Sequence, residues 1–298
     1  SGNLNLGVPG IMYLGGIAGL AGAFWYESNF ASPVPIVGLL ISLVCALAAA
    51  ALAGLIYSFL TITLRANQNV TGLTLTTFGI GLSLAMSFSM TNKAGGAPKL
   101  SAGFIASLDT VRIPYLSDIP YIGKLLFSLN PLVYFGVFIA VAGALYLKHT
   151  RPGLSLRAIG ENPYSADAAG INVTVMKYLH IVAGGGICGI GGAYMSLVTA
   201  NGSWQPGGIV NGMGWIAVAL VIFASWSPSK AILGSFIFGA FNSLNNYIPA
   251  RVIEIPNAFW QMLPFVLTTV VLIVTSVRKS RENAQPAGCG VNYFREER

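Results

Sequence analysis

The sequence predicts an all-α protein, built as a polytopic bundle of membrane helices. Its residues are 54% apolar and only 8% charged, and the mean hydropathy is +0.70. A chain of 298 residues with this composition lacks the polar groups needed to cover a water-facing surface. The apolar residues also gather in long runs that approach the roughly 20 residues required to cross a bilayer.

Eight apolar runs are candidate membrane spans: residues 4–26, 36–61, 70–90, 131–149, 175–198, 213–226, 231–247 and 258–277. At about 1.5 Å per residue, the first, second and fifth are long enough to cross about 30 Å of hydrocarbon. Residues 213–226 would extend only about 21 Å, so we expect this run to be broken or partly buried in protein. The chain is apolar from Leu4 onward, and an upstream segment is expected to bring the full-length count to nine or ten spans.

The distribution of basic residues predicts one orientation. With Arg157 and the C-terminal tail placed in the cytoplasm, alternating spans leave all but five of the 16 Lys and Arg residues inside. The exceptions are Lys93, Lys99, Arg112, Lys124 and Arg251. The chain then divides into a membrane domain of residues 1–277, with a cytoplasmic loop at 150–174, and a cytoplasmic tail of residues 278–298. We expect this tail to be disordered from Asn283 onward.

The external segment of residues 91–130 is long for a connection in a compact domain. It could cover a pathway, receive a binding protein, or serve only as a connection, and the sequence does not choose among these.

Several classes of function lack their motifs. The Gly123-Lys124 pair is followed by Leu125 rather than Ser or Thr, so the chain has no nucleotide-binding P-loop. His149 and His180 are far apart in sequence and form no zinc motif. The basic residues are scattered among loops, which is atypical of nucleic-acid binding. We therefore expect no metal, no cofactor and no nucleic acid on this chain.

Proton-coupled carriers place titratable groups within their spans, yet no Asp or Glu lies well inside any span here. This disfavours proton coupling, although sodium coupling through backbone carbonyls and hydroxyls stays open. His180 is interpreted as a satisfied interfacial residue rather than a proton relay. No paired carboxylates or Ser-His set can be assembled from the spans, which argues against an intramembrane enzyme.

Glycines are concentrated in two of the spans, at Gly15, Gly16, Gly19 and Gly22 in the first, and at Gly184, Gly185, Gly186, Gly189, Gly191 and Gly192 in the fifth. Small residues let helix backbones approach closely, so we interpret these stripes as packing surfaces rather than substrate contacts.

Two spans begin with similar runs rich in amides and glycine, N-Q-N-V-T-G at 67–72 and G-G-I-V-N-G at 207–212. Transporters expose backbone and amide groups to cargo at interrupted half-helices near the midplane. Asn69, Thr71, Thr74, Asn211 and Trp215 are therefore candidate pathway residues. They offer neutral hydrogen bonds and an aromatic face, which suits an uncharged polar solute with a ring. The alternative is that both runs are ordinary helix starts at the interface.

The polar stretch at 157–173 contains signals for a short helix. Asn162 is a good N-cap, Pro163 suits the first helical position, and Gly170 suits the position past the end. They predict a two-turn helix over Pro163–Ala169. The small side chains of Ala166, Ala168 and Ala169 would let a partner protein approach, and Arg157, Glu161 and Asp167 would offer charged contacts. A capped turn in an ordinary loop is the alternative.

This stretch, R-A-I-G-E-N-P-Y-S-A-D-A-A-G-I-N-V, closely resembles the cytoplasmic loop of permeases in the ribose- and nucleoside-type family of bacterial ABC importers. The opening S-G-N-L-N-L-G-V-P-G-I-M is similar to that family's S-G-x-x-N-[IL]-G-x-E-G-x-M stretch. G-M-G-W-I-A-V-A at 212–219 is similar to its G-x-G-[FW]-x-A-[IV]-A run. Two departures are Pro9, where many relatives have Glu, and the missing first hydrophobic segment upstream.

The resemblance implies a permease subunit of an ATP-driven importer, multi-pass in the bacterial cytoplasmic membrane, which moves solute by alternating access and is not an enzyme. Its cytoplasmic loop would contain the coupling helix that inserts into the ATPase. The implied coupling residues are Arg157, Gly160, Glu161, Asn162, Pro163, Ala166, Asp167, Ala169 and Gly170. Asn5, in the opening motif, joins the candidate pathway residues.

The implied partners are a separate ABC ATPase that binds ATP and Mg, a second permease (a different one or a copy), an external solute-binding lipoprotein, and membrane lipid. A nucleoside is the expected solute, and a simple sugar or a vitamin such as riboflavin is the alternative. A hypothesis of another class is an ATP-independent carrier or channel for small neutral solutes, which sodium or voltage dependence without ATP would favour.

Overall fold

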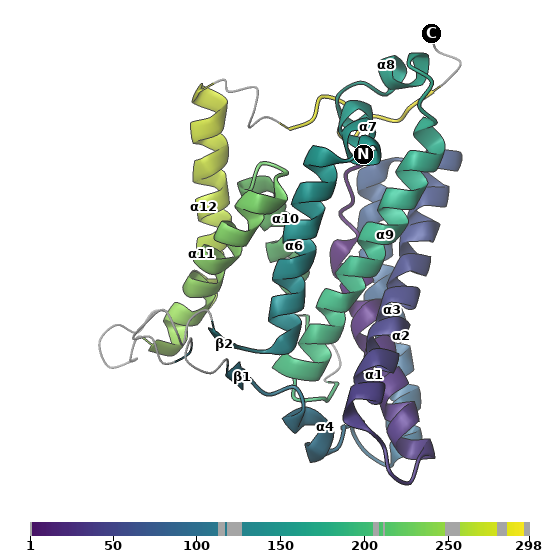
Figure 1. Ribbon diagram of the computed structural model, residues 1–298, viewed down its shortest axis with the longest axis vertical. Coiled ribbons are helices and arrows are strands. Elements are labelled where there is room, and N and C mark those ends of the chain that lie inside the picture. Colours follow the sequence, from purple (N-terminus) through teal and green to yellow (C-terminus); the bar gives the residue numbers. More distant parts are fainter. Residues whose placement is uncertain are drawn as a thin grey trace.

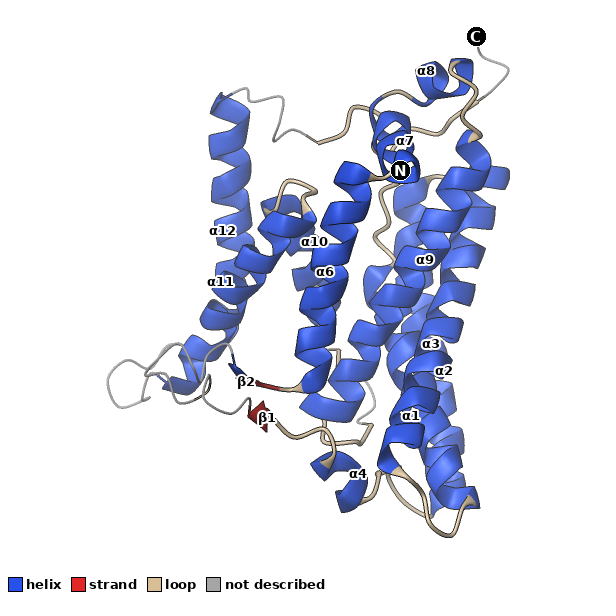
Figure 2. Ribbon diagram, viewed as in Figure 1, coloured by secondary structure: helices blue, strands red, loops and turns tan. Residues whose placement is uncertain are grey.

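The computed structural model describes residues 2–112, 117, 127–204, 209–210, 212–247, 257–278 and 285–294. Every predicted apolar run coincides with a helix (Figures 1 and 2). The elements are α1 (Val8–Asn29), α2 (Pro35–Ser58), the π-helix η1 (Phe59–Thr63), α3 (Gln68–Ala94), α4 (Ala102–Ala106), β1 (Val111–Arg112), β2 (Ser128–Leu129), α6 (Pro131–His149), α7 (Arg151–Glu161), α8 (Pro163–Ala168), α9 (Val173–Tyr194), the π-helix η2 (Met195–Thr199), α10 (Met213–Phe223), α11 (Pro228–Tyr247) and α12 (Asn257–Arg278).

The prediction of a polytopic helix bundle is confirmed. Among the described residues, five helices are long and apolar enough to cross a membrane: Val8–Asn29, Pro35–Thr63, Gln68–Lys93, Pro131–His149 and Val173–Thr199. α10 has only 11 residues, in keeping with its predicted shortness. A small addition to the predicted all-α fold is the antiparallel pair β1–β2, in which Val111 faces Leu129.

The helices form two groups (Figure 1). α1, α2, α3 and α9 make one tightly packed group, α10 to α12 make another, and α6 runs between them. α1 lies at the centre of the first group, where Ile17 and Leu20 are fully buried. Val44, Leu52 and Phe88 are each at least 60% exposed on the outer faces of α2 and α3. In a bilayer these faces meet lipid or another apolar helix.

The glycines of α1 and α9 are packing positions, as predicted. A Cβ at Gly192 of α9 would come within 2.8 Å of the Met12 carbonyl carbon of α1. A Cβ at Gly15 would clash with the Gly189 backbone of α9, and a Cβ at Gly189 would clash with Ala46 and Ala50 of α2. The two helices therefore meet backbone to backbone, as small residues allow. Gly184 is different, since a Cβ there would meet no described atom within 4 Å.

The two ends of the bundle carry different structures (Figure 1). α7, α8, the N-terminal residues and the C-terminal residues lie at one end, and α4, β1 and β2 lie at the other. The segment predicted to be external is more than a bare connection, because its residues Leu100, Phe104 and Leu108 are buried in the main core. Glu27 of α1 also accepts hydrogen bonds from the Ser101 amide (2.9 Å) and hydroxyl (2.6 Å).

The expectation of a disordered tail is wrong for residues 285–294. Gly288 donates a backbone hydrogen bond to the Gly160 carbonyl (2.9 Å), and the Asn292 side chain donates to the Arg65 carbonyl (2.8 Å). Because its polar groups find partners more than 100 residues away in sequence, this segment is held against the bundle.

Candidate functional site: coupling loop and pathway

The candidate coupling loop (residues 150–174) contains two capped helices. The Thr150 hydroxyl accepts from the Gly153 amide (3.2 Å) at the start of α7. The Asn162 side-chain oxygen accepts from the Tyr164 (3.0 Å) and Ser165 (3.1 Å) amides at the start of α8. Gly170 follows α8 with a φ of +82°, a conformation that glycine adopts without strain. The predicted cap and ending are confirmed, and α8 is one residue shorter than predicted.

The faces of this loop correct one expectation. Ala166 is only 4% exposed and packs in a small apolar cluster with Ile159 and Val173, so it offers no surface to a partner. Gly160 and Pro163 are also buried, and Asp167 is half-buried. The exposed members of the predicted coupling set are Arg157, Glu161, Asn162, Ala169 and Gly170. The buried members pack α7 and α8 onto the bundle, and the exposed members form the outer surface of the loop.

Replacing the cap of α8 is expected to weaken the loop. Asn162→Ala removes the acceptor for two backbone amides and should cost about 1 kcal/mol of local stability. Asn162→Ser and Asn162→Asp preserve capping and should largely restore it. Hydrogen exchange at the α8 amides measures the effect. Equal exchange in Asn162→Ala and Asn162→Ser would contradict the role of the cap.

The start of α3 is an ordinary helix start rather than a half-helix. α3 is 27 residues long, and its first residue, Gln68, hydrogen-bonds Asn292 of the tail at the α7–α8 end of the bundle (3.2 Å). Asn69 and Thr74 lie on the exposed face of α3, whereas Thr71 is 7% exposed. The structure therefore does not bring these three candidate pathway residues together on one face.

The recessed helix starts belong to α1 and α10. Gly10 of α1 packs against Leu75 and Gly79 of α3. At a rise of about 1.5 Å per residue, these two residues lie roughly 10–16 Å from Gln68, the first residue of α3. At the start of α10, Gly214 meets Pro9 so closely that a Cβ would lie 2.5 Å from the Pro9 Cα. Two helices therefore begin side by side within the bundle, the arrangement expected along a transport pathway. Trp215 follows and is half-buried, whereas Asn211 lies outside the described residues.

The non-helical residues before α1 are held by side chains of two other helices. Gln68 accepts from the Leu4 amide (2.7 Å), the Tyr57 hydroxyl donates to the Leu4 carbonyl (2.7 Å), and the Thr76 hydroxyl donates to the Leu6 carbonyl (3.0 Å). Asn5 accepts from the nearby Gly7 amide (2.8 Å). Sequence reasoning missed Gln68, Tyr57 and Thr76, because nothing local marks a partner more than 50 residues away.

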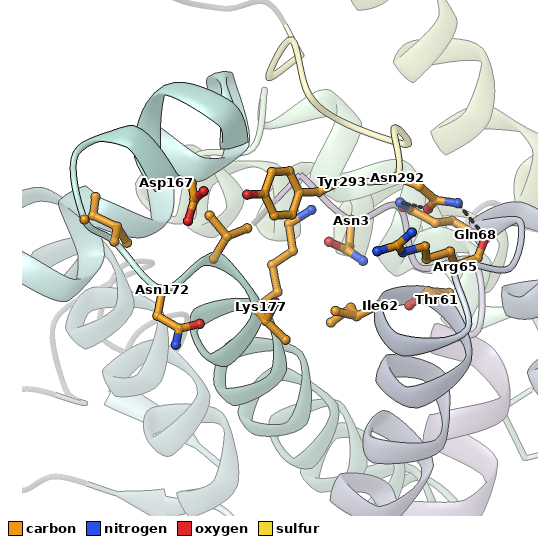
Figure 3. A pocket seen from close by; sticks show the side chains of 14 residues that line it. Asn3, Thr61, Ile62, Arg65, Gln68, Asp167, Asn172, Lys177, Asn292 and Tyr293 are labelled. Carbon is orange, nitrogen blue, oxygen red and sulfur yellow. Dashed lines mark hydrogen bonds between the residues drawn. The ribbon is translucent and has the colours of Figure 1, made fainter. Parts of the chain in front are cut away.

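A cavity of about 290 Å³ opens beside α8, at the α7–α8 end of the bundle (Figure 3). Its walls come from the α2–α3 connection, α8, the start of α9 and the tail, and its polar lining includes Asn3, Arg65, Gln68, Asp167, Lys177 and Asn292. Lys177, in the second turn of α9, is only 3% exposed. Lys177 was not among the residues predicted from the sequence, although a buried charge in a span usually has a function.

His180 has the satisfied environment that the sequence predicted. Its Nε2 lies 2.9 Å from the Tyr146 hydroxyl, and its Nδ1 lies 2.7 Å from the Met176 carbonyl oxygen. Both ring nitrogens are engaged, so the residue joins α6 to α9.

A bundle of membrane helices, with two helix starts meeting in its interior and a capped polar loop at one end, is typical of a multi-pass transport permease. Residues 1–272 match the model of the family described as branched-chain amino acid transport system permease components. The chain belongs to this family of permeases.

Three curated relatives are permeases of ABC transporters. A nucleoside permease of Lactococcus lactis is 32% identical over 99% of this chain and 89% of its own length. A guanosine permease of Bacillus subtilis is 31% identical over 91% of this chain and 83% of its own. A protein described as a glucose permease, from Haloferax volcanii, is 32% identical over 82% of this chain and 69% of its own. No solved structure is significantly similar to the chain.

Proposed function

We propose that this chain forms the membrane pathway of an ATP-driven importer for nucleosides. The observation that carries the proposal is the match to a nucleoside permease over 99% of this chain, which includes both the recessed helix starts and the coupling loop. The neutral candidates Asn5 and Trp215 suit an uncharged solute with a ring, because they offer hydrogen bonding and an aromatic face without a fixed charge.

The energy would come from a separate ABC ATPase that binds ATP and Mg, since this chain has no P-loop. A second permease, different or identical, would complete the pathway in the bacterial cytoplasmic membrane, and an external lipoprotein would deliver the solute. Closure of the ATPase pair would push on α8. The cluster of Ile159, Ala166 and Val173 would pass this movement to α9, and the backbone contact between α9 and α1 would pass it to the pathway.

A simple sugar is the second candidate solute, favoured by the glucose permease among the relatives. Both solutes are neutral and polar, and they differ in the aromatic base. A base could stack on Trp215, whereas a sugar gains less from an aromatic face. The ATP-independent carrier is disfavoured, because the family consists of permease components of transport systems and the relatives named above are permeases of ABC transporters.

Transport by the assembled complex decides the solute. We expect the complex in proteoliposomes with its binding protein to take up labelled guanosine or adenosine when ATP is supplied. Excess unlabelled nucleoside should compete, and excess glucose should not. ATP-dependent uptake of glucose alone would assign the sugar role, and uptake driven by a sodium gradient without ATP would refute the importer proposal. Trp215→Ala, with Trp226→Ala as the matched control, tests the aromatic contact.

A further inference from the structure

The tail segment (residues 285–294) runs across the coupling end of the bundle and contacts the loop that is expected to meet the ATPase (Figure 1). Its first half lies along the end of α7. Besides the bond from Gly288 to Gly160, the Ala287 amide lies 3.4 Å from a Glu161 carboxylate oxygen. Gly290 donates to the Gly2 carbonyl (2.9 Å). The first half therefore joins α7 to the N-terminal residues.

The second half of the tail segment lies between α8 and the α2–α3 connection (residues 64–67). The Tyr293 ring packs on the Tyr164 ring of α8, with centroids 5.2 Å apart, and borders the cluster that contains Ala166. On its other side, Asn292 donates to the Arg65 carbonyl and accepts from Gln68 (Figure 3). The Arg65 guanidinium lies 4.7 Å from the centre of the Phe294 ring.

We infer that the tail segment is a strap that transmits movement of the coupling helices to the pathway. The contacts run from α8 to Tyr293, Asn292, Gln68 and Leu4 in that order. None of these residues is expected to touch solute or nucleotide. Gln68 is the turning point, because it bonds Asn292 through its amide nitrogen and the Leu4 backbone through its oxygen. Leu4 belongs to the segment that enters the recessed start of α1. The role of the strap in transport rests on the function proposed above.

The close fit of the tail supports a specific contact. A Cβ at Gly288 would lie 2.9 Å from the Gly160 oxygen, and a Cβ at Gly2 would lie 2.9 Å from the Gly288 oxygen. The glycines at positions 2 and 288 thus let three backbone segments meet closely. Val291, between the two contact regions, is 54% exposed and serves as a natural control position.

The test compares Asn292→Ala with Val291→Ala in the full complex. Asn292→Ala removes the bonds to the α2–α3 connection and to Gln68, whereas Val291→Ala trims an exposed side chain of the same segment. We expect solute-stimulated ATP hydrolysis and uptake to fall at least about fivefold in Asn292→Ala, the lower end of typical coupling between sites. Basal hydrolysis and assembly should not change. Gly288→Val, which displaces the other half of the strap, should behave like Asn292→Ala.

Three outcomes would overturn the inference. The first is solute-stimulated hydrolysis in Asn292→Ala equal to that in Val291→Ala. The second is a loss of stimulated hydrolysis that is fully explained by a lower yield of the assembled complex. The third is unchanged hydrogen exchange of the α2–α3 connection in Asn292→Ala without solute, and this measurement decides the inference whatever the solute is. Lack of stimulation of the wild-type complex by any nucleoside or sugar would instead refute the proposed function, and increased exchange in Asn292→Ala would still support the strap.

Discussion

Tryptophan at Ala169 is expected to abolish solute-stimulated ATP hydrolysis while leaving the chain folded in the membrane. Ala169 is exposed immediately after α8, where its small side chain would leave room for the proposed ATPase. An indole at the centre of a docking surface should prevent close approach. Loss of a hot-spot contact costs about 2 kcal/mol or more, so binding of the ATPase should weaken about thirtyfold or more. Co-purification of the ATPase and its stimulated activity measure the effect.

Ala106→Trp is the matched control, since Ala106 is also exposed on a short helix but lies at the opposite end of the bundle. Its ATPase recovery should equal that of the wild type. A second variant, Glu161→Ala, removes charge without adding bulk and should cause a smaller loss in the same direction. Full stimulation of the Ala169→Trp complex would show that α8 is not the docking element, and the coupling proposal would be abandoned.

The local features of the coupling loop could be predicted because their causes are local. Asn162, Pro163 and Gly170 lie within nine positions and determine where α8 begins and ends. The same signals did not reveal that Ala166 faces inward, because that depends on the cluster with Ile159 and Val173. Sequence therefore predicted the helix and only part of its outer surface.

The features of the pathway were predicted less well, because they depend on residues that are distant in sequence. Amide and glycine residues before two spans predicted recessed helix starts, and α10 has this arrangement, but α3 does not. The recessed partner of α10 is α1, whose preceding residues depend on Gln68, Tyr57 and Thr76 from other helices. The tail was misjudged for the same reason. Its composition is typical of disorder, and its order comes from distant backbone groups such as the carbonyls of Gly160 and Arg65.

The substitution Gly192→Ala is expected to destabilise the bundle, whereas Gly184→Ala is not. The Cβ at position 192 would meet the Met12 carbonyl of α1, backbone that cannot rotate away as a side chain can. Overpacking of a tight core costs about 1–3 kcal/mol. Gly184→Ala, in the same helix, meets no described atom and should gain up to about 1 kcal/mol from the higher helix propensity of alanine. The two melting temperatures in detergent should therefore move in opposite directions.

The same pair of variants tests how movement would reach the pathway. α9 begins at the coupling loop and meets α1 directly at Gly192, so a methyl group there should separate the two helices that carry the proposed movement. We expect the Gly192→Ala variant to lose uptake even at temperatures well below its own melting temperature, where it is still folded. Gly184→Ala should transport like the wild type. If Gly192→Ala melts and transports like Gly184→Ala, α1 and α9 can move apart without cost, and the link from α8 to the pathway must run through the tail segment and Gln68 alone.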